Sequence, residues 1–360
     1  MHFNEAIFID NIGKIIVFLM LLFSIFLLTV KSKKRLPNFL FAAFLLVTAF
    51  DLSGLFLGSA IAQFETLQHI KTASSLLQMP LFFLYVLAVC YADFKLHWKQ
   101  LLHSLPFVIF LGIFSFNIFP NYPYDLYEVA GEVQYFTYII AIFLVLKRHK
   151  TIYLENFSNP DYSAYKWLFQ ATVLFCIAHT FVLIRMYLEY MNITHPAASL
   201  INVVISISAL SVTCWMVMKS MYEPSIFLGT TRELQPLQSS KTKLDLPVKN
   251  ERIQQLRAFM DSEKPYLDYE LSLEKLAQQV QMEEKELSLL INHQIGKHFF
   301  DFINEYRIAA AKAILKNPAK KKLTVLEILY EVGFNSKSSF YTAFKKETGQ
   351  TPVSYRKSNS

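Results

Sequence analysis

Cysteine is scarce in this sequence, which limits the chemistry available to it. Only three copies occur in 360 residues, Cys90, Cys176 and Cys214, and each falls within an apolar run. No CxxC pair and no complete set of Cys and His residues at zinc-site spacing is present, so neither a disulfide framework nor a zinc site is expected. The nine histidines are scattered and form no ligand set. We therefore expect no metal and no cofactor, and we interpret the cysteines as small hydrophobic residues in helix packing.

Charged residues are also few, which argues against an ordinary soluble protein. They make up 18% of the chain, whereas soluble proteins contain about 25%. Glycine is scarce as well, with 9 copies against 33 phenylalanines, which favours helices over loops. The shortage of charge is uneven, because residues 231–360 hold 21 Lys and Arg against 16 Asp and Glu. An apolar part is thus followed by a charged part of net charge +5, which suits a polyanionic partner.

Catalytic signatures are missing from the apolar part. It contains no HExxH, no GxSxG and no phosphate-binding P-loop. These patterns place nucleophiles, metal ligands or phosphate-binding amides at fixed distances from one another. Without them no reaction can be assigned, and we expect that the protein is not an enzyme.

What the apolar part does contain is seven segments suited to crossing a membrane. A helix needs about 20 mainly apolar residues to span a bilayer. The predicted spans are Ile12–Val30, Asn38–Ala60, Thr72–Tyr91, Leu101–Phe119, Val133–Leu146, Trp167–Leu188 and Leu200–Met218. The fifth is short unless Tyr124–Glu132 extends it. We expect residues 1–221 to form a transmembrane domain within a lipid bilayer.

Basic residues beside the spans indicate their orientation. Lys31–Arg35, Asp93–Lys99, Lys147–Lys150 and Lys219 follow the first, third, fifth and seventh spans, and the opposite loops are poor in Lys and Arg. Because cytoplasmic loops are enriched in these residues, the N-terminus is expected outside and the C-terminus in the cytoplasm. No basic cluster precedes the first span, which favours a retained span over a cleaved leader. The expected location is the bacterial cytoplasmic (inner) membrane, crossed several times.

Polar residues within the predicted spans are candidates for sensing a signal, because such residues are costly in lipid. At about 1.5 Å per helical residue, Asp51 and Arg185 fall at the same outer level of the membrane. We therefore predict a pocket open to the outside that contains an Asp51–Arg185 pair. The alternative is a polar cluster that only fixes helix packing. The candidate sensing residues are Asp51, Glu132, His179, Arg185 and Asn202. The signal itself is an unknown small molecule or a membrane property.

Residues 222–249 are predicted to form a flexible linker. They mix Pro, Gly, Ser, Thr, Gln and Lys without helical periodicity. A coil of this length has a root-mean-square reach of about 30 Å. Such a coil transmits a signal poorly by rigid leverage, so proximity or formation of a homodimer is the easier mechanism.

Residues 250–360 show helical periodicity and include a predicted helix–turn–helix near their end. "TVLEILYEV" (Thr324–Val332) is a short amphipathic helix, and "GFN" (Gly333–Asn335) is a turn in which glycine permits a left-handed backbone. The next helix is predicted from about Ser336 to Thr348, with Phe340 and Phe344 in the core. Its opposite face suits a DNA major groove. That face carries Lys337, Ser338, Tyr341, Thr342 and Lys345.

This helix–turn–helix and the preceding "RIAAAKAIL" carry a resemblance to a known family. Residues of about 250–358 resemble the DNA-binding domain of AraC/XylS-type transcription regulators, and the multi-span N-terminal part is similar in architecture to membrane-bound regulators of Bacteroidetes-type bacteria. The resemblance implies seven helices, with two helix–turn–helix units joined by a long helix. It also implies which side chains read bases. These are Lys285, Ser288, Leu289 and Asn292 in the first unit, and Lys337, Ser338, Tyr341 and Thr342 in the second.

Other residues are candidates for contacts to DNA phosphates, which position a protein without specifying a sequence. Thr351 and Pro352 are predicted to begin a helix as its N-cap and first-turn proline, leaving free N–H groups for a phosphate. The basic candidates are Lys297, Lys345, Lys346 and Arg356.

Two departures from the AraC/XylS pattern predict weak DNA binding by a single copy. The family often has Arg where this chain has Leu289 and Thr342, and Arg makes the commonest bidentate contact to guanine. The first unit also carries Glu283, Glu284 and Glu286, which repel phosphate unless they lie away from it. We expect the second unit to bind more strongly, and a dimer to compensate by raising the effective concentration.

Together these features predict an all-α chain, with a seven-helix transmembrane bundle followed by a seven-helix double helix–turn–helix domain. The predicted function is a membrane-bound one-component transcription regulator that binds specific double-stranded DNA. One alternative is a membrane transporter or enzyme with a regulatory DNA-binding tail, although few Gly or Pro breaks interrupt the spans. Another is a tether that holds DNA without switching, with low specificity and steep salt dependence.

Overall fold

The computed structural model describes residues 4–32, 35–91, 93–118, 123–158, 163–192, 196–224, 227 and 250–358. Within these ranges the regular structure is helical, and one isolated β-bridge pairs Phe157 with Ser272. The prediction of an all-α chain is therefore confirmed. The chain divides into two compact units. We call residues 1–147 and 162–235 the first unit, and residues 148–161 and 236–360 the second unit.

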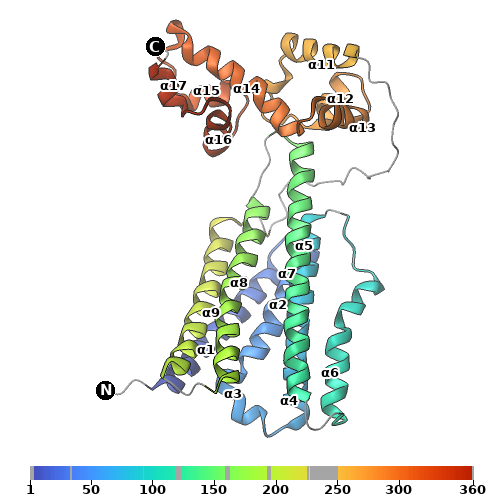
Figure 1. The fold of residues 1–360 in the computed structure, drawn as a ribbon, viewed down its shortest axis with the longest axis vertical. Coiled ribbons are helices and arrows are strands. Elements are labelled where there is room, and N and C mark those ends of the chain that lie inside the picture. Colours follow the sequence, from blue (N-terminus) through green and yellow to red (C-terminus); the bar gives the residue numbers. More distant parts are fainter. Residues whose placement is uncertain are drawn as a thin grey trace. The chain divides into compact units, whose positions relative to one another are not determined.

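Long apolar helices make up the first unit (Figure 1). They are α1 (Glu5–Thr29), α2 (Arg35–Leu52), α3 (Gly54–Ile61), α4 (Glu65–Ser74), α5 (Gln78–Cys90), α6 (Leu105–Ser115), α7 (Pro123–Asn156), α8 (Ser163–Tyr190) and α9 (Pro196–Tyr222). A short 3-10 turn joins α4 to α5, and another leads into α6. Seven helical stretches of the described residues are long and apolar enough to cross a membrane, judged by length and composition. This is the number that the sequence predicts.

Two of the stretches differ from the predicted spans. The second span was expected as Asn38–Ala60, but α2 ends at Leu52 and α3 begins at Gly54, so the helix is interrupted just after Asp51. The fifth was expected as Val133–Leu146, whereas α7 runs from Pro123 to Asn156. Lys147–Lys150 ends the apolar run but does not end the helix, because Lys and Arg are good helix formers.

An aromatic core holds the first unit together around α2. Phe41 is fully buried, stacks on Tyr85 at 4.6 Å between ring centroids, and meets Trp167 edge-on. The Trp167 indole N–H donates to the Tyr85 hydroxyl at 2.9 Å, which satisfies a polar group in an otherwise apolar core. Trp167 also stacks on Trp215. These contacts join α2, α5, α8 and α9, and they fix the helix that carries Asp51.

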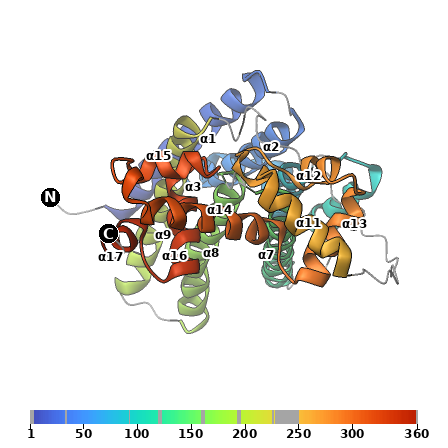
Figure 2. The same cartoon turned by 90° about the horizontal axis from the view of Figure 1, so that it is seen from above.

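The second unit contains the helices predicted for a double helix–turn–helix domain. They are α11 (Asn250–Ser262), α12 (Leu273–Gln279), α13 (Glu284–Leu289), α14 (Phe299–Lys316), α15 (Val325–Glu331), α16 (Lys337–Thr348) and α17 (Pro352–Ser358). Both views place α14 between the group α11–α13 and the group α15–α17 (Figures 1 and 2). The first half of α14 buries Phe299, Phe302 and Ile303 in the core of the former group. Its second half buries Ile308 and Leu315 in a separate core beneath α15–α17.

The division into units differs from the predicted domain boundaries. Residues 1–221 were expected to form one domain, yet the second unit also contains residues 148–161, from the C-terminal end of α7 onwards. The reason is tertiary and has no counterpart in the local sequence pattern: Ser158 is fully buried and bonds to Leu271 and Arg307. The predicted linker, residues 222–249, lies almost entirely outside the described residues.

Candidate functional site

The second helix–turn–helix has the boundaries that the sequence predicts. Thr324 caps α15, and the Ser336 hydroxyl caps α16 by accepting the Ser339 N–H. Between them Gly333 has a φ of +86°, a left-handed conformation that favours glycine. A Cβ at this position would lie 2.4 Å from the Tyr266 carbonyl oxygen, so glycine is also required by the close approach of another segment.

The face of α16 predicted to read DNA is turned away from the core. Phe340 and Phe344 are fully buried on one side of the helix. Ser338, Thr342 and Lys345 are exposed on the other side, and Lys337 is exposed as the first residue of the helix, three and seven positions before the two phenylalanines. Tyr341 is only half-exposed, because its ring packs against the core beneath α15–α17, and the Lys337 ammonium lies 5.6 Å from the ring centroid. The exposed side chains can enter a groove without disturbing the core. Tyr341 instead packs against that core and contacts Lys337.

The first helix–turn–helix presents a less open face. Leu287, Leu290 and Ile291 are buried as predicted. The candidate readers Lys285, Ser288, Leu289 and Asn292 are all partly buried. Beyond Leu289 the helix changes to π geometry over Leu290–Ile295, which the sequence did not predict. Helices of this kind are often found at functional sites.

Two of the candidate base-reading residues in the first helix–turn–helix are bonded to each other. The Asn292 side-chain amide donates to the Ser288 hydroxyl at 3.1 Å. Base readout by Asn292 therefore requires this bond to be exchanged for one to a base edge. In the second helix–turn–helix, Thr342 is exposed, so a bond from its side chain to a base does not require the loss of such an internal bond.

The three acidic residues at the start of the first helix–turn–helix lie in different surroundings. Glu286 forms an ion pair with Arg252 of α11, so its repulsion of a phosphate is reduced. Burial, together with the neighbouring Glu274 carboxylate, raises the pKa of Glu284. Glu283 stands at the N-cap position of α13 and is exposed. The Arg252 side chain thus offsets part of the negative charge that the sequence places on this helix–turn–helix.

The candidates for phosphate contacts differ in exposure and in pairing. Lys345 and Thr351 are exposed, and the Thr351 hydroxyl caps α17 by accepting the Ser354 N–H at 3.2 Å. Lys346 pairs with Asp301 at 2.7 Å, and Lys297 pairs with Glu305 at 2.6 Å. Arg356 is partly buried. The two paired lysines can reach a phosphate only by leaving their carboxylates, so they are expected to contribute less than Lys345.

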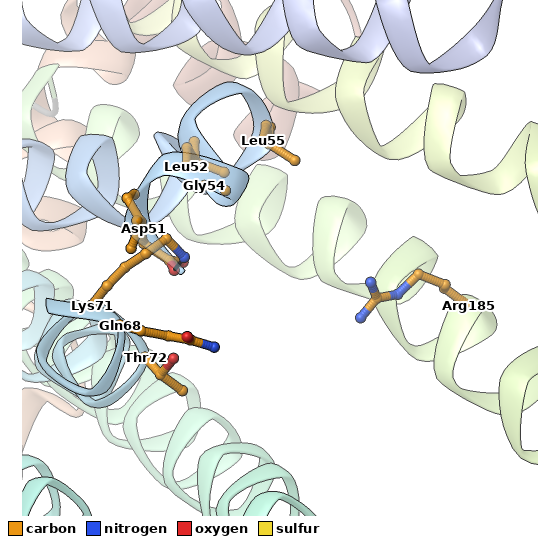
Figure 3. A pocket seen from close by; sticks show the side chains of 10 residues that line it. Asp51, Leu52, Gly54, Leu55, Gln68, Lys71, Thr72 and Arg185 are labelled. Atoms are coloured by element: carbon orange, nitrogen blue, oxygen red, sulfur yellow. Dashed lines mark hydrogen bonds and ion pairs between the residues drawn. The ribbon is translucent and has the colours of Figure 1, made fainter. Parts of the chain in front are cut away.

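A polar pocket of about 460 Å³ lies in the first unit, beside the break between α2 and α3 (Figure 3). Asp51 forms an ion pair there with Lys71 at 3.2 Å and accepts a hydrogen bond from the Gln78 amide at 3.2 Å. The Lys71 side chain passes directly over Gly54, where a Cβ would lie 2.5 Å from it. Glycine at this position therefore allows Lys71 to reach the carboxylate.

The predicted Asp51–Arg185 pair is not formed. Arg185 lines the same pocket but stands across it from Asp51, and its ion-pair partner is Glu189 at 3.7 Å (Figure 3). Lys71 takes its place as the partner of Asp51. The sequence did not single out Lys71, because it lies one residue before the predicted third span. A lysine beside a span boundary is the signal that could have found it.

The other sensing candidates lie apart from this pocket. His179 of α8 is hydrogen-bonded to Glu132 of α7 at 2.9 Å and stacks on Tyr135 at 3.7 Å between ring centroids. Asn202 of α9 lines neither group, and its carbonyl accepts a bond from Ser206 within its own helix. Asp51 and Arg185 thus line one pocket without contact, whereas Glu132 and His179 form a bonded pair elsewhere.

Comparisons with known proteins find similarity over part of the chain. The profile of a family described as a helix-turn-helix domain matches residues 276–358. An uncharacterized HTH-type transcriptional regulator of Bacillus subtilis, YdeC, is 32% identical over 90 residues, which are 25% of this chain and 30% of that protein. An uncharacterized HTH-type transcriptional regulator of Staphylococcus aureus is 37% identical over 87 residues, which are 24% of this chain and 11% of that protein.

The chain thus spans less than a third of the length of either regulator. A solved structure from Listeria innocua, of a protein with unknown function, is 29% identical and covers 30% of this chain and 97% of its own, with a TM-score of 0.26. That score is too low to support an argument about fold. The matched residues 276–358 coincide with α12–α17 and their joining segments, so the family match and the helices agree on a helix-turn-helix domain in this part of the chain.

Proposed function

We propose that the protein is a membrane-bound one-component transcription regulator that binds specific double-stranded DNA through two helix–turn–helix units. The observation that carries this proposal is the face of α16, where Ser338, Thr342 and Lys345 are exposed on the side away from a fully buried Phe340 and Phe344, with Lys337 exposed at the start of the helix. The match to a helix-turn-helix domain and the names of the two relatives, both transcriptional regulators, support the same function.

Membrane anchoring is supported by the surface of the long helices. Large apolar side chains such as Phe18, Ile25 and Leu144 are 63%, 58% and 62% exposed, respectively. Soluble monomers rarely expose such side chains in extended patches, whereas a lipid-facing helix requires them. Together with the basic loops, this supports a place in the bacterial inner membrane with the second unit in the cytoplasm.

Signal sensing is assigned to the polar groups of the first unit. The pocket contains both signs of charge, from Asp51, Lys71 and Arg185, alongside apolar walls that include Leu52 and Ile61. Charged groups in apolar surroundings are costly unless they serve packing or function. A small molecule that competes for one of these charges would change the Lys71–Asp51 pair and thus the ends of α2 and α4.

A homodimer is part of the proposal, because one copy is expected to bind DNA weakly. Thr342 and Leu289 replace the arginines common at these positions, so each half-site loses a strong contact. Holding two copies in one membrane raises the effective concentration of the second reading domain. Footprints on natural sites are therefore expected to cover two copies of the recognised sequence.

The experiment that tests the function uses the full chain in lipid nanodiscs. Random-sequence DNA is selected for binding, and the enriched sites are footprinted at several salt concentrations. We expect one enriched motif, present in two copies, each with two protected major-groove segments about one helical turn apart. Binding that follows the salt concentration and enriches no sequence would overturn the proposal and favour the tether.

A further inference from the structure

The second unit includes a segment that the sequence assigned to the membrane domain. Residues 148–158, here called the docking segment, comprise the last turns of α7 and the two residues after it. Phe157 forms an antiparallel bridge with Ser272, the N-cap of α12. The Ser158 hydroxyl donates to the Leu271 carbonyl at 2.6 Å, and the Ser158 N–H donates to the same oxygen at 3.3 Å.

The docking segment completes the environment of a buried arginine. Arg307 of α14 is fully buried, and its guanidinium donates four hydrogen bonds. Two go to carbonyls of the connection before α12, at Tyr266 (2.7 Å) and Asp268 (2.9 Å). The other two go to Ser158, at its carbonyl (3.2 Å) and its hydroxyl (3.0 Å). Half of the acceptors that replace water around this cation therefore come from the docking segment.

Arg307 also lies between the two helix–turn–helix units, here called the reading units. It occupies the middle of α14, whose two halves belong to separate cores. Its guanidinium carbon lies 5.5 Å from the centroid of the Phe334 ring, in the turn of the second helix–turn–helix. The connection that carries Tyr266 leads into the first helix–turn–helix and packs closely against Gly333 of the second. The arginine thus contacts the turn of the second helix–turn–helix and the connection that leads into the first.

The physical chemistry of this cation explains why the contact matters. Burial lowers the pKa of Arg307 to about 9, which reflects the removal of water from the charge. A buried donor that loses its acceptor costs more than a typical hydrogen bond contributes, and charged donors cost most. Losing Ser158 would therefore favour rearrangement of Arg307 toward other acceptors. Such a rearrangement would change the angle between the two reading units.

We propose that the docking segment is a regulatory contact, which holds the two reading units in one orientation by binding Arg307 and so lets α7 alter DNA binding. The inference rests on the proposed function, because it concerns affinity for DNA. α7 also carries Glu132, whose bond to His179 is a sensing candidate, so one helix bears both the polar pair and the docking segment. A second contact at the same place is the Glu155–His298 ion pair, at 3.8 Å.

The docking itself is tested by a disulfide across the bridge. Residues paired in an antiparallel bridge have Cα atoms about 4.5–5.5 Å apart, which suits a disulfide. The full chain carries Phe157→Cys and Ser272→Cys, with a protease site placed in residues 222–249. After oxidation in membranes and cleavage, the two fragments should stay joined on a non-reducing gel. The control pair Lys150→Cys and Ser272→Cys, about two helical turns earlier in α7, should separate.

The regulatory role is tested by Ser158→Ala in the full chain in nanodiscs. The variant removes the hydroxyl acceptor of Arg307, and the matched control is Ser262→Ala, an exposed serine of α11. On a selected site with both protected segments, Ser158→Ala should weaken binding by about tenfold. On a site with only the segment read by α16, the affinity should be unchanged. The 157–272 disulfide, formed in the Ser158→Ala background, should restore the affinity for the full site.

The outcomes separate the inference from the function on which it rests. Fragments that separate as readily as those of the control pair would overturn the docking. Equal affinities of Ser158→Ala and Ser262→Ala for the full site would overturn the regulatory role, as would an equal loss of affinity on both kinds of site. If the wild-type chain itself enriches no DNA sequence, the proposed function fails and the regulatory role fails with it. That result is recognised because it does not depend on position 158.

Discussion

Neighbouring residues of α16 are expected to make different contributions to DNA binding. Thr342 and Lys345 are both exposed and lie one turn apart on the face opposite Phe344. A threonine hydroxyl can bond to a base edge, whereas an exposed lysine bonds to phosphate as a point charge. Thr342 is therefore expected to contribute to specificity, and Lys345 to affinity alone.

Replacing each of these two residues by alanine should separate the two contributions. Thr342→Ala is expected to reduce discrimination at one base-pair position by about 1 kcal/mol while leaving the salt dependence unchanged. Lys345→Ala should weaken binding to all sequences alike and lower the salt slope by about one. Binding titrations on single-base variants of the selected site, at several salt concentrations, measure both quantities. Equal effects of the two variants on base preference would contradict the assignment.

At the residue scale the sequence predicted the core better than the polar contacts. Phe340 and Phe344 follow from helical spacing, because burial of an apolar face depends only on local periodicity. The partner of Asp51 could not be found in this way. Lys71 lies 20 residues further along the chain, and its approach depends on the break between α2 and α3 and on the missing side chain of Gly54. Such contacts depend on tertiary structure that periodicity does not contain.

Individual helices of the second unit are defined by their ends. α15 has a capping box, in which the Glu327 carboxylate accepts bonds from the Thr324 N–H at 2.7 Å and from its hydroxyl at 2.8 Å. α16 instead ends at Gly349, whose φ is +73°. Both signals are visible in the sequence. The π-helical turn after α13 is not, because it depends on how Leu290 and Ile291 pack into the core.

The capping box of α15 should make stability depend on pH. The Thr324 N–H, and then the Thr324 hydroxyl, lower the pKa of Glu327. A depressed pKa contributes stability that is fully present above the unfolded value of about 4.3 and is lost as the pH falls through the lower folded value. Glu327→Gln should remove this part of the acid sensitivity, since glutamine does not titrate. Urea unfolding of the second unit, followed by proteolysis at pH 6 and at pH 3, compares the variant with Glu347→Gln.

Alanine in the turn between α15 and α16 should be far more damaging than at the end of α16. Gly333 and Gly349 both have positive φ, which costs an alanine about 1–2 kcal/mol. Only at position 333 would the new Cβ also meet backbone oxygens, those of Tyr266 at 2.4 Å and Leu267 at 2.8 Å. Gly349→Ala should therefore lower the unfolding free energy modestly, and Gly333→Ala should abolish specific DNA binding. Similar unfolding midpoints of the two variants would contradict the structural account.

At the scale of the whole molecule, the pattern of apolar runs predicted the number of long helices but not how the units are composed. Hydropathy is a property of consecutive residues, so it identifies seven candidate spans. It assigns residues 148–158 to the part of the chain that surrounds them. The second unit recruits this segment through bonds to Arg307, 149 residues further along. No local pattern records a contact at that separation.

Topology is the whole-molecule prediction that most needs a measurement. The basic residues Lys31–Arg35 and Lys147–Lys150 should hold the segments that carry them in the cytoplasm. A fluorescent protein fused after Lys219 is therefore expected to fluoresce, and a phosphatase fused there is expected to be inactive. A phosphatase placed between α6 and α7 should be active. The reverse pattern would place the second unit outside, where DNA is not available.

The contact between Ser158 and Arg307 also determines the order in which the protein can be completed during synthesis. The arginine is added 149 residues after the serine. At roughly 5–20 residues per second, the serine waits about 7–30 s for its partner. All of the first unit, including α8 and α9, is made within or before that interval. The helix–turn–helix domain therefore cannot complete the contacts of its buried arginine until the ribosome has synthesised the helices of the first unit.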